Sequence, residues 1–123
     1  MRKNKTALAG IRDESYRRQI YDLLFRKLEY ITTVVSTQEK MYVLMNKREY
    51  DLYVMEMDLG NPGSVDTTVA KNLYNNLEER IKLGDVKFLC LCNNLIALNN
   101  AHKEGISACL TSKLISDPRK FIK

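Results

Sequence analysis

The sequence of 123 residues has few of the side chains on which most catalytic and metal sites depend. Its single histidine and three cysteines form no Ser-His-Asp or Cys-His pattern, and Cys90 and Cys92 have the wrong spacing for a zinc knuckle. We interpret Cys90, Cys92 and Cys109 as small buried residues in a reducing compartment. His102 is expected at the surface, near the end of a helix. We therefore expect no enzyme.

Long hydrophobic runs and large blocks of one charge are also missing. No segment has the length of a membrane span, and the segment 1–5 leads into a strand pattern and not into a signal-peptide core, so we expect a cytoplasmic protein without membrane contact. The net charge is +5, but lysine and arginine are scattered through every segment. This favours a solvated surface over nucleic-acid binding. One domain over residues 1–123 is expected, either ending early or forming the N-terminal part of a longer chain.

Apolar segments alternate with amphipathic ones along the whole chain. Strands are expected at Thr6–Ile11, Ile31–Val35, within Tyr50–Gly63, at Val86–Cys92 and at Ile106–Leu110. Helices are expected at about 15–27, after a capping box at Ser36–Glu39, at about 66–83, at about 94–104, and in a short last turn from Asp117. This alternation predicts an α/β fold with a doubly wound parallel sheet of five strands and helices on both faces.

The stretch Tyr50–Gly63 carries the most distinctive chemistry. A mostly apolar run leads into Glu56 and Asp58, and a Gly-Asn-Pro-Gly sequence then ends it. Side chains two positions apart share one face of a strand. Functional groups in doubly wound folds collect beyond the carboxyl ends of the strands, so we expect a site in the loops after Ile11, Asp58 and Cys92. Asp13 either caps the next helix or adds a carboxylate there.

The order of these features resembles the receiver domain of two-component response regulators, over nearly the whole chain. The resemblance is carried by Asp13-Glu14, Arg18 and Leu23-Leu24, by Glu49-Tyr50-Asp51-Leu52, by Asp58 with Pro62-Gly63, and by Gly105 with Leu110-Thr111-Ser112-Lys113. It implies a CheY-like, flavodoxin-like fold with strand order 2-1-3-4-5 and a role in phosphorelay signal transduction. The implied partner is a histidine kinase or a downstream effector, bound through the face from about Leu95 to Lys113. A homodimer is compatible with it.

In that family, an aspartate ending the third strand accepts a phosphoryl group, acids after the first strand hold Mg2+, and a hydroxyl and a lysine contact the phosphoryl group. The resemblance places Asp13 and Asp58 as Mg2+ ligands in a working site. Cys92 takes the place of the hydroxyl residue and is a poor hydrogen-bond donor. Lys113 lies one residue beyond the lysine position, which Ser112 occupies. Arg12 replaces one of the acids, which argues against Mg2+.

Two registers of the third strand remain open. Counting forward from Tyr50 places Glu56 in the acceptor position, whereas counting back from Pro62 places Asp58 there. We favour Glu56, because the buried run before it is fixed by the sheet. The sequence then predicts an atypical receiver that works through protein–protein contacts, with Glu56 standing in for the phosphorylated aspartate. The alternative is a conventional phospho-receiver with Asp58 as acceptor.

A flavodoxin-like cofactor binder is a third, less favoured interpretation. It would need a phosphate-binding loop rich in Gly, Ser and Thr after the first strand. The segment 10–15 is charged and has one glycine.

Overall fold

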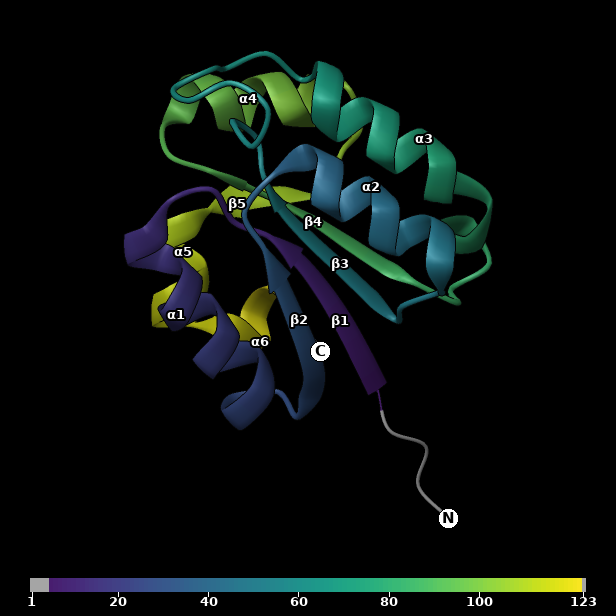
Figure 1. The fold of residues 1–123 in the computed structure, drawn as a ribbon. Coiled ribbons are helices and arrows are strands. Elements are labelled where there is room, and N and C mark those ends of the chain that lie inside the picture. The colour runs from purple at the N-terminus through teal and green to yellow at the C-terminus, as the bar shows by residue number, and fades with distance from the viewer. Residues whose placement is uncertain (1–4, 123) are drawn as a thin grey trace.

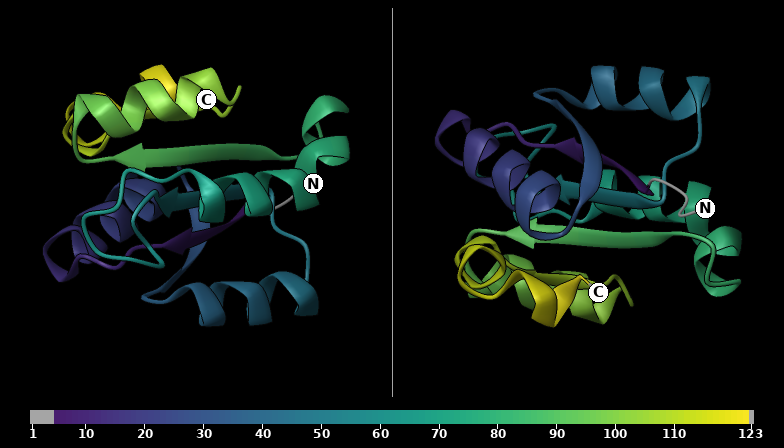
Figure 2. Two further views of the ribbon diagram at one scale, coloured as in Figure 1. Left: turned by 90° about the horizontal axis from the view of Figure 1, so that it is seen from above. Right: turned by 90° about the horizontal axis from the view of Figure 1, so that it is seen from below.

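A single sheet of five parallel strands organises the computed structural model, which describes residues 5–122. The strands are β1 (Lys5–Gly10), β2 (Tyr30–Val35), β3 (Leu52–Glu56), β4 (Lys87–Cys92) and β5 (Ala108–Leu110). Their order is β2-β1-β3-β4-β5, which confirms the predicted doubly wound fold (Figure 1). The strand arrows in Figure 2 run in one direction, so all carboxyl ends lie at the same edge.

Helices follow every strand, as the sequence pattern predicts. They are α1 (Glu14–Asp22) with the π-helical continuation η1 (Leu23–Lys27), α2 (Gln38–Lys47), α3 (Thr68–Lys82), α4 (Leu95–Lys103), α5 (Thr111–Ser116) and α6 (Pro118–Phe121). The sequence pattern predicted one regular helix at about 15–27, and the structure widens its second half into a π-helix. Within the described residues, no helix combines the length and the apolar character needed to cross a membrane.

Two hydrophobic clusters bind the helices to the two faces of the sheet. On one face, α2, α3 and α4 pack through residues such as Met41, Leu73 and Ala97. On the other face, α1, η1 and α5 pack through Ile20, Leu24 and Leu114. Figure 1 shows these two helical layers on opposite sides of the strands. Because β3 lies in the centre of the sheet, all five of its residues are buried, including Glu56.

Two local predictions were wrong. The side chain of Thr37, and not that of Ser36, caps α2, because its hydroxyl accepts the N–H of Lys40 at 3.2 Å. The last strand was predicted at Ile106–Leu110, whereas β5 begins only at Ala108, and α5 begins at Thr111 directly after it. The chain therefore forms one more short helix, α5, before the predicted final turn.

Candidate functional site

Glu56 ends β3 at the carboxyl edge of the sheet, and its side chain is fully buried at 0% exposure. One carboxylate oxygen, Oε1, accepts the backbone N–H of Asp13 at 2.9 Å. The other oxygen, Oε2, has no hydrogen-bond partner among the described residues. Burial raises the pKa of Glu56 above its usual value, and the nearby Asp58 raises it further, while the N–H of Asp13 opposes this. The buried environment thus favours the protonated form of Glu56.

Asp58 lies just beyond the strand, in the turn between β3 and α3. It is 4% exposed, and its Oδ2 accepts both the Gly63 N–H at 2.9 Å and the Arg12 guanidinium at 3.0 Å. The Asp58 carboxylate therefore stabilises the turn after β3 through Gly63 and binds the Arg12 side chain from the β1–α1 loop. The hydrogen bond to Asp58 is the largest cause of the raised pKa of the Arg12 guanidinium. Glu56 and Asp58 both lie at the carboxyl edge of the sheet. Glu56 is the last residue of β3, and Asp58 lies two residues beyond the strand.

The β1–α1 loop brings Arg12 and Asp13 to this edge. Asp13 caps α1, because its Oδ1 accepts the N–H and the hydroxyl of Ser15 at 2.9 Å and 2.6 Å. These bonds lower the pKa of Asp13. Arg17 fixes the loop from the other side by donating to the carbonyls of Ile11 and Arg12 at 3.1 Å and 3.2 Å. The Asp13 carboxylate is thus used for capping and faces its own helix.

The arrangement does not suit Mg2+. Within the described residues, no three His, Cys, Asp or Glu side chains are placed to share a metal ion. Mg2+ in proteins keeps several water ligands, whereas the cavity beside Asp58 has a volume of about 20 Å3, which is space for about one water molecule. The Arg12 guanidinium already occupies the Oδ2 atom of Asp58. A cation from the protein thus neutralises the carboxylate.

Three buried polar atoms at this edge have no partner within the described residues: Oε2 of Glu56, Oδ1 of Asp58 and Nε of Arg12. Unsatisfied buried groups are costly, and their clustering marks a strained or functional place. Because two are carboxylate oxygens, one proton on Glu56 would lower the repulsion between them. This agrees with the direction of the Glu56 pKa.

The ends of β4 and β5 complete the edge with residues that the sequence only partly indicated. Cys92 is buried, and its carbonyl accepts the hydroxyl of Thr111 at 3.4 Å. That hydroxyl is also 3.4 Å from Oδ1 of Asn93. A depression of about 420 Å3 lies beside them, lined by Asp13, Tyr16, Cys92, Asn93, Asn94, Leu95, Leu110, Thr111 and Ser112. Thr111 was not identified as a site residue from the sequence. Its position directly after β5, at the carboxyl end of a strand, could have indicated it.

Ser112 and Lys113 lie in the first turn of α5 and are both exposed. Ser112 lines the depression. No hydrogen bond or ion pair within the described chain joins Lys113 to Glu56 or Asp58, so the structure brings these three residues into no direct contact. The predicted phosphate-pairing role of Lys113 and Ser112 stays a prediction.

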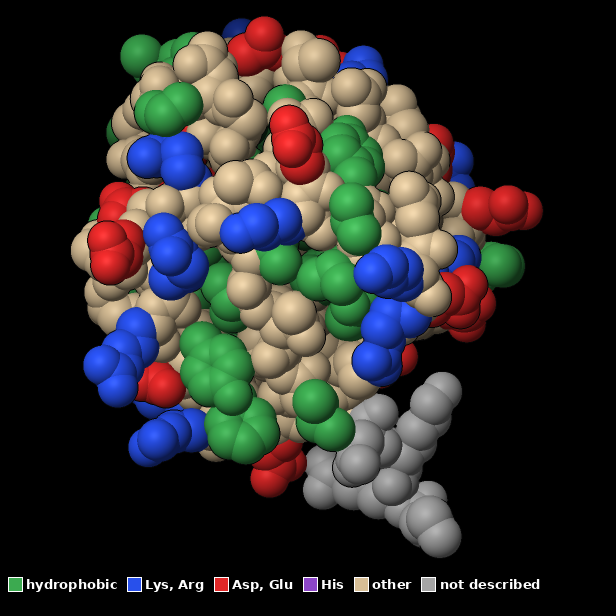
Figure 3. Space-filling view, viewed as in Figure 1, with side chains coloured by type: hydrophobic (Ala, Val, Ile, Leu, Met, Phe, Trp, Pro, Cys, Tyr) green, Lys and Arg blue, Asp and Glu red, His purple; other side chains and the backbone are tan. Residues whose placement is uncertain are grey.

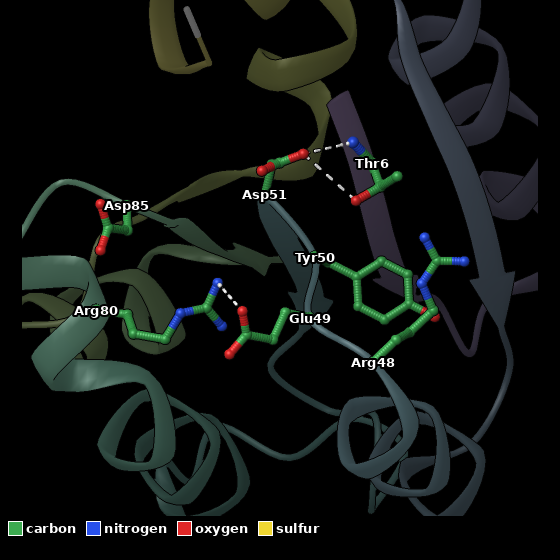
Figure 4. A pocket seen from close by; sticks show the side chains of 7 residues that line it. All are labelled: Thr6, Arg48, Glu49, Tyr50, Asp51, Arg80 and Asp85. Atoms are coloured by element: carbon green, nitrogen blue, oxygen red, sulfur yellow. Dashed lines mark hydrogen bonds and ion pairs between the residues drawn. The ribbon is translucent and has the colours of Figure 1, made fainter. Parts of the chain in front are cut away.

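A second pocket, of about 510 Å3, opens at the opposite, amino-terminal edge of the sheet. Figure 4 shows its lining by Thr6, Arg48, Glu49, Tyr50, Asp51, Arg80 and Asp85. Asp51 accepts the backbone N–H of Thr6 at 2.8 Å and so joins the starts of β1 and β3. Arg80 lies 3.6 Å from the Glu49 carboxylate. Asp51, Arg80 and Glu49 thus have partners within the lining, which indicates a structural role for these side chains.

A doubly wound parallel sheet with acids at its carboxyl edge defines the class of the fold as flavodoxin-like. Comparison with solved structures narrows this class, and the chain has the fold of the CheY-like response regulator receiver domains. No known family model and no curated protein matches the sequence.

The similar structures come from different bacteria. The receiver domain of an HD domain-containing protein from Pseudomonas fluorescens has a TM-score of 0.66 and 16% identity, over 98% of this chain and 95% of that one. The chemotaxis response regulator CheY4 of Vibrio cholerae has a TM-score of 0.66 and 10% identity, over 98% and 100%. The response regulator RcsB of Salmonella typhimurium reaches 0.70 with 12% identity, over 97% and 58%. The likeness establishes the fold and leaves the chemistry to the residues of this chain.

Proposed function

We propose that the chain is an atypical receiver domain of a two-component or phosphorelay system, with Glu56 in the acceptor position. It acts by presenting a protein-binding face, takes no phosphoryl group and is not itself an enzyme. The observation that carries this proposal is the ion pair between Arg12 and Asp58 beside the fully buried Glu56. An internal cation at this carboxylate supplies electrostatically what a metal ion would otherwise supply.

The charge state of Glu56 modifies the predicted mechanism. A glutamate that imitates a phosphorylated aspartate should be ionised and should face a lysine. Here burial raises the Glu56 pKa, and Oε1 faces the backbone of Asp13. We therefore propose that Glu56 fixes the β1–α1 loop in one arrangement and does not imitate a phosphoryl group.

The proposed face for a kinase or effector is the surface of α4 and β5, from about Leu95 to Lys113. Two large hydrophobic side chains, Leu95 and Ile96, are exposed at the start of α4. On the same surface, Nε2 of His102 lies 3.3 Å from the carbonyl of Ala108 and links α4 to β5. Exposed apolar groups on α4 support a protein-binding role for this face.

Phosphorylation with a small donor tests the proposal. The purified protein is incubated with acetyl phosphate and Mg2+, and its intact mass is measured alongside a receiver domain of known activity. We expect no gain of a phosphoryl group on this chain. Stoichiometric labelling that disappears in Asp58→Asn would overturn the proposal.

The conventional phospho-receiver is the second candidate, and one observation favours it. Asp58 has an oxygen, Oδ1, without a hydrogen-bond partner in the described structure. A phosphoryl group on Asp58 would require Arg12 to leave or to turn toward the new charge. Absence of labelling together with absence of Mg2+ binding in calorimetry would exclude this candidate.

A further inference from the structure

The edge strand β2 leaves part of its backbone without a partner in the sheet. The N–H of Ile11 donates to the carbonyl of Val35 at 2.9 Å, so Val35 directs its backbone groups toward β1. Because direction alternates along a strand, Ile31 and Thr33 also face β1, and Thr32 and Val34 face outward. β2 has no neighbour on this side within the described sheet. The outward groups can therefore pair with an added strand.

The sequence of β2 lacks the features that usually protect a sheet edge. The strand reads Tyr-Ile-Thr-Thr-Val-Val, without charge, proline or glycine. Natural edge strands are commonly protected by lysine, proline, bulges or a covering segment. A six-residue strand rich in β-branched residues is long enough to bind an extended peptide.

Exposed apolar side chains continue from this edge onto both flanking helical layers. Ile31 on β2 is 51% exposed and Val43 on α2 is 50% exposed. An apolar groove of about 360 Å3 lies between these elements, lined by Val35, Glu39, Lys40, Val43 and Leu44. On the opposite face, the rings of Tyr21 and Phe25 are exposed and 5.7 Å apart. Whichever face of an added strand carries its apolar side chains, those side chains would thus meet exposed apolar surface.

The charges around the edge select the kind of partner. On α1, η1, α2 and the turns beside them, the exposed basic residues are Arg18, Arg26, Lys27, Lys40, Lys47 and Arg48, and the exposed acidic residues are Glu14, Glu29, Glu39 and Glu49. Figure 3 shows hydrophobic side chains over this face with Lys and Arg beside them. A second copy would bring like charges together, and each chain carries +5. An acidic segment would be attracted.

We propose that β2 is a docking edge for an extended segment of a partner protein, in which acidic and apolar residues alternate. The segment adds a sixth strand beside β2, and its backbone pairs with Thr32 and Val34. This surface lies at the opposite edge of the sheet from β5 and does not depend on the chemistry at Glu56.

Three synthetic peptides test the proposal: an alternating Val-Glu octapeptide, the matching Val-Lys octapeptide, and a Val-Glu peptide interrupted by prolines. Binding is measured by amide hydrogen exchange resolved by NMR. The Val-Glu peptide is expected to slow exchange at Thr32 and Val34. Ile31 and Thr33 act as internal controls, because their N–H groups already face β1. The Val-Lys peptide should bind roughly tenfold more weakly, and the proline peptide should not protect either amide.

Two variants locate the effect on β2. Thr32→Pro removes an outward N–H while leaving the bonds to β1, and edge strands tolerate proline. Ile31→Glu keeps the whole backbone and adds a charge that repels the acidic peptide, so it remains informative if Thr32→Pro does not fold. Both should abolish protection. Leu83→Glu is the matched control, because Leu83 is 70% exposed at the end of α3 and should leave binding unchanged.

Other results would overturn the proposal. Equal binding of the Val-Glu and Val-Lys peptides would show that charge does not select the partner. Unchanged exchange at Thr32 and Val34 would show that no peptide pairs with β2. Self-association in sedimentation that is lost in Thr32→Pro would assign β2 to a second copy of the chain instead of an acidic partner.

Discussion

At the scale of single residues, Glu56 combines complete burial with one oxygen that has no partner among residues 5–122. A carboxyl group with a raised folded pKa binds its proton more tightly in the folded state than in the unfolded state. The contribution of Glu56 to stability is therefore greatest below the ordinary pKa of 4.5 and decreases as the pH rises from there to the raised folded value. The pKa of Asp13 is lowered, so its contribution to stability is present above pH 3.8 and is lost as the pH falls below that value. The effects of Glu56 and Asp13 on stability therefore occupy separate pH ranges.

Replacing Glu56 with glutamine should remove this pH dependence. The glutamine carbonyl can still accept the Asp13 N–H, and no charge has to be buried. At pH 7 we expect Glu56→Gln to be more stable than the wild type by on the order of 1 kcal/mol. Urea unfolding at a series of pH values checks this. A wild-type stability that does not fall as the pH rises above 4.5 would contradict a raised pKa of Glu56.

The ion pair between Arg12 and Asp58 gives a second prediction at this scale. Arg12→Ala leaves the Asp58 carboxylate, 4% exposed, without its cation, so we expect a loss of about 2 kcal/mol in unfolding free energy. Lys71→Ala is the matched control, because the Lys71–Glu104 pair is exposed and its loss should cost less than about 1 kcal/mol.

A double-mutant cycle separates the pair from its surroundings. In the background of Asp58→Asn, the Arg12→Ala substitution should cost much less, because the buried charge is gone. Equal costs in both backgrounds would show that Arg12 acts through packing alone.

At the scale of elements, the start of α2 distinguishes two hydroxyl residues that the sequence could not separate. Thr37 has extended backbone angles and its hydroxyl accepts the Lys40 N–H. Thr37→Ala should therefore lower the stability by about 1 kcal/mol. Ser36→Ala should change it by less than about 0.5 kcal/mol. Thermal unfolding of both variants measures the difference, and a larger effect of Ser36→Ala would restore the predicted capping box.

Much of the arrangement of elements could be predicted, because hydrophobic periodicity reports directly on which face of a segment is buried. The segment 52–55 is uniformly apolar since β3 is covered on both faces. The end of the chain was harder. The apolar run Ile106–Leu110 predicts a strand of five residues, but β5 is an edge strand of three residues, and α5 starts where its pairing ends.

The candidate site was predictable as a place and less so as a set of contacts. Glu56, Asp58, Arg12 and Asp13 do meet at one edge, as the parallel strands require. The sequence could not reveal which carboxylate Arg12 would reach, or that Asp13 would turn toward Ser15. Such choices depend on side-chain rotamers and on distances between elements separated by more than forty residues.

At the scale of the whole molecule, the two acids at the carboxyl edge lie between two potential binding surfaces. The exposed hydrophobic residues of α4 lie toward one side of the sheet, and the unprotected edge of β2 lies on the other. Arg12 already neutralises the Asp58 carboxylate, so the acidic site at the carboxyl edge does not need an external cation for charge balance. The domain can then serve as a fixed support for protein contacts.

The site departs from the receiver pattern in Arg12, which replaces an acid, and in Glu56, which replaces the accepting aspartate. Reversing both substitutions tests whether the domain is a fixed support for protein contacts. In Arg12→Asp combined with Glu56→Asp, the cation is replaced by a carboxylate and the shorter side chain at position 56 opens space. We expect this double variant to bind Mg2+ with a dissociation constant in about the millimolar range by isothermal titration calorimetry, and the wild type to show no binding heat. Arg18→Asp, at an exposed position of α1, controls for the added negative charge. Measurable Mg2+ binding by the wild type would mean that Arg12 moves away from Asp58 in solution, and the proposed fixed site would then be wrong.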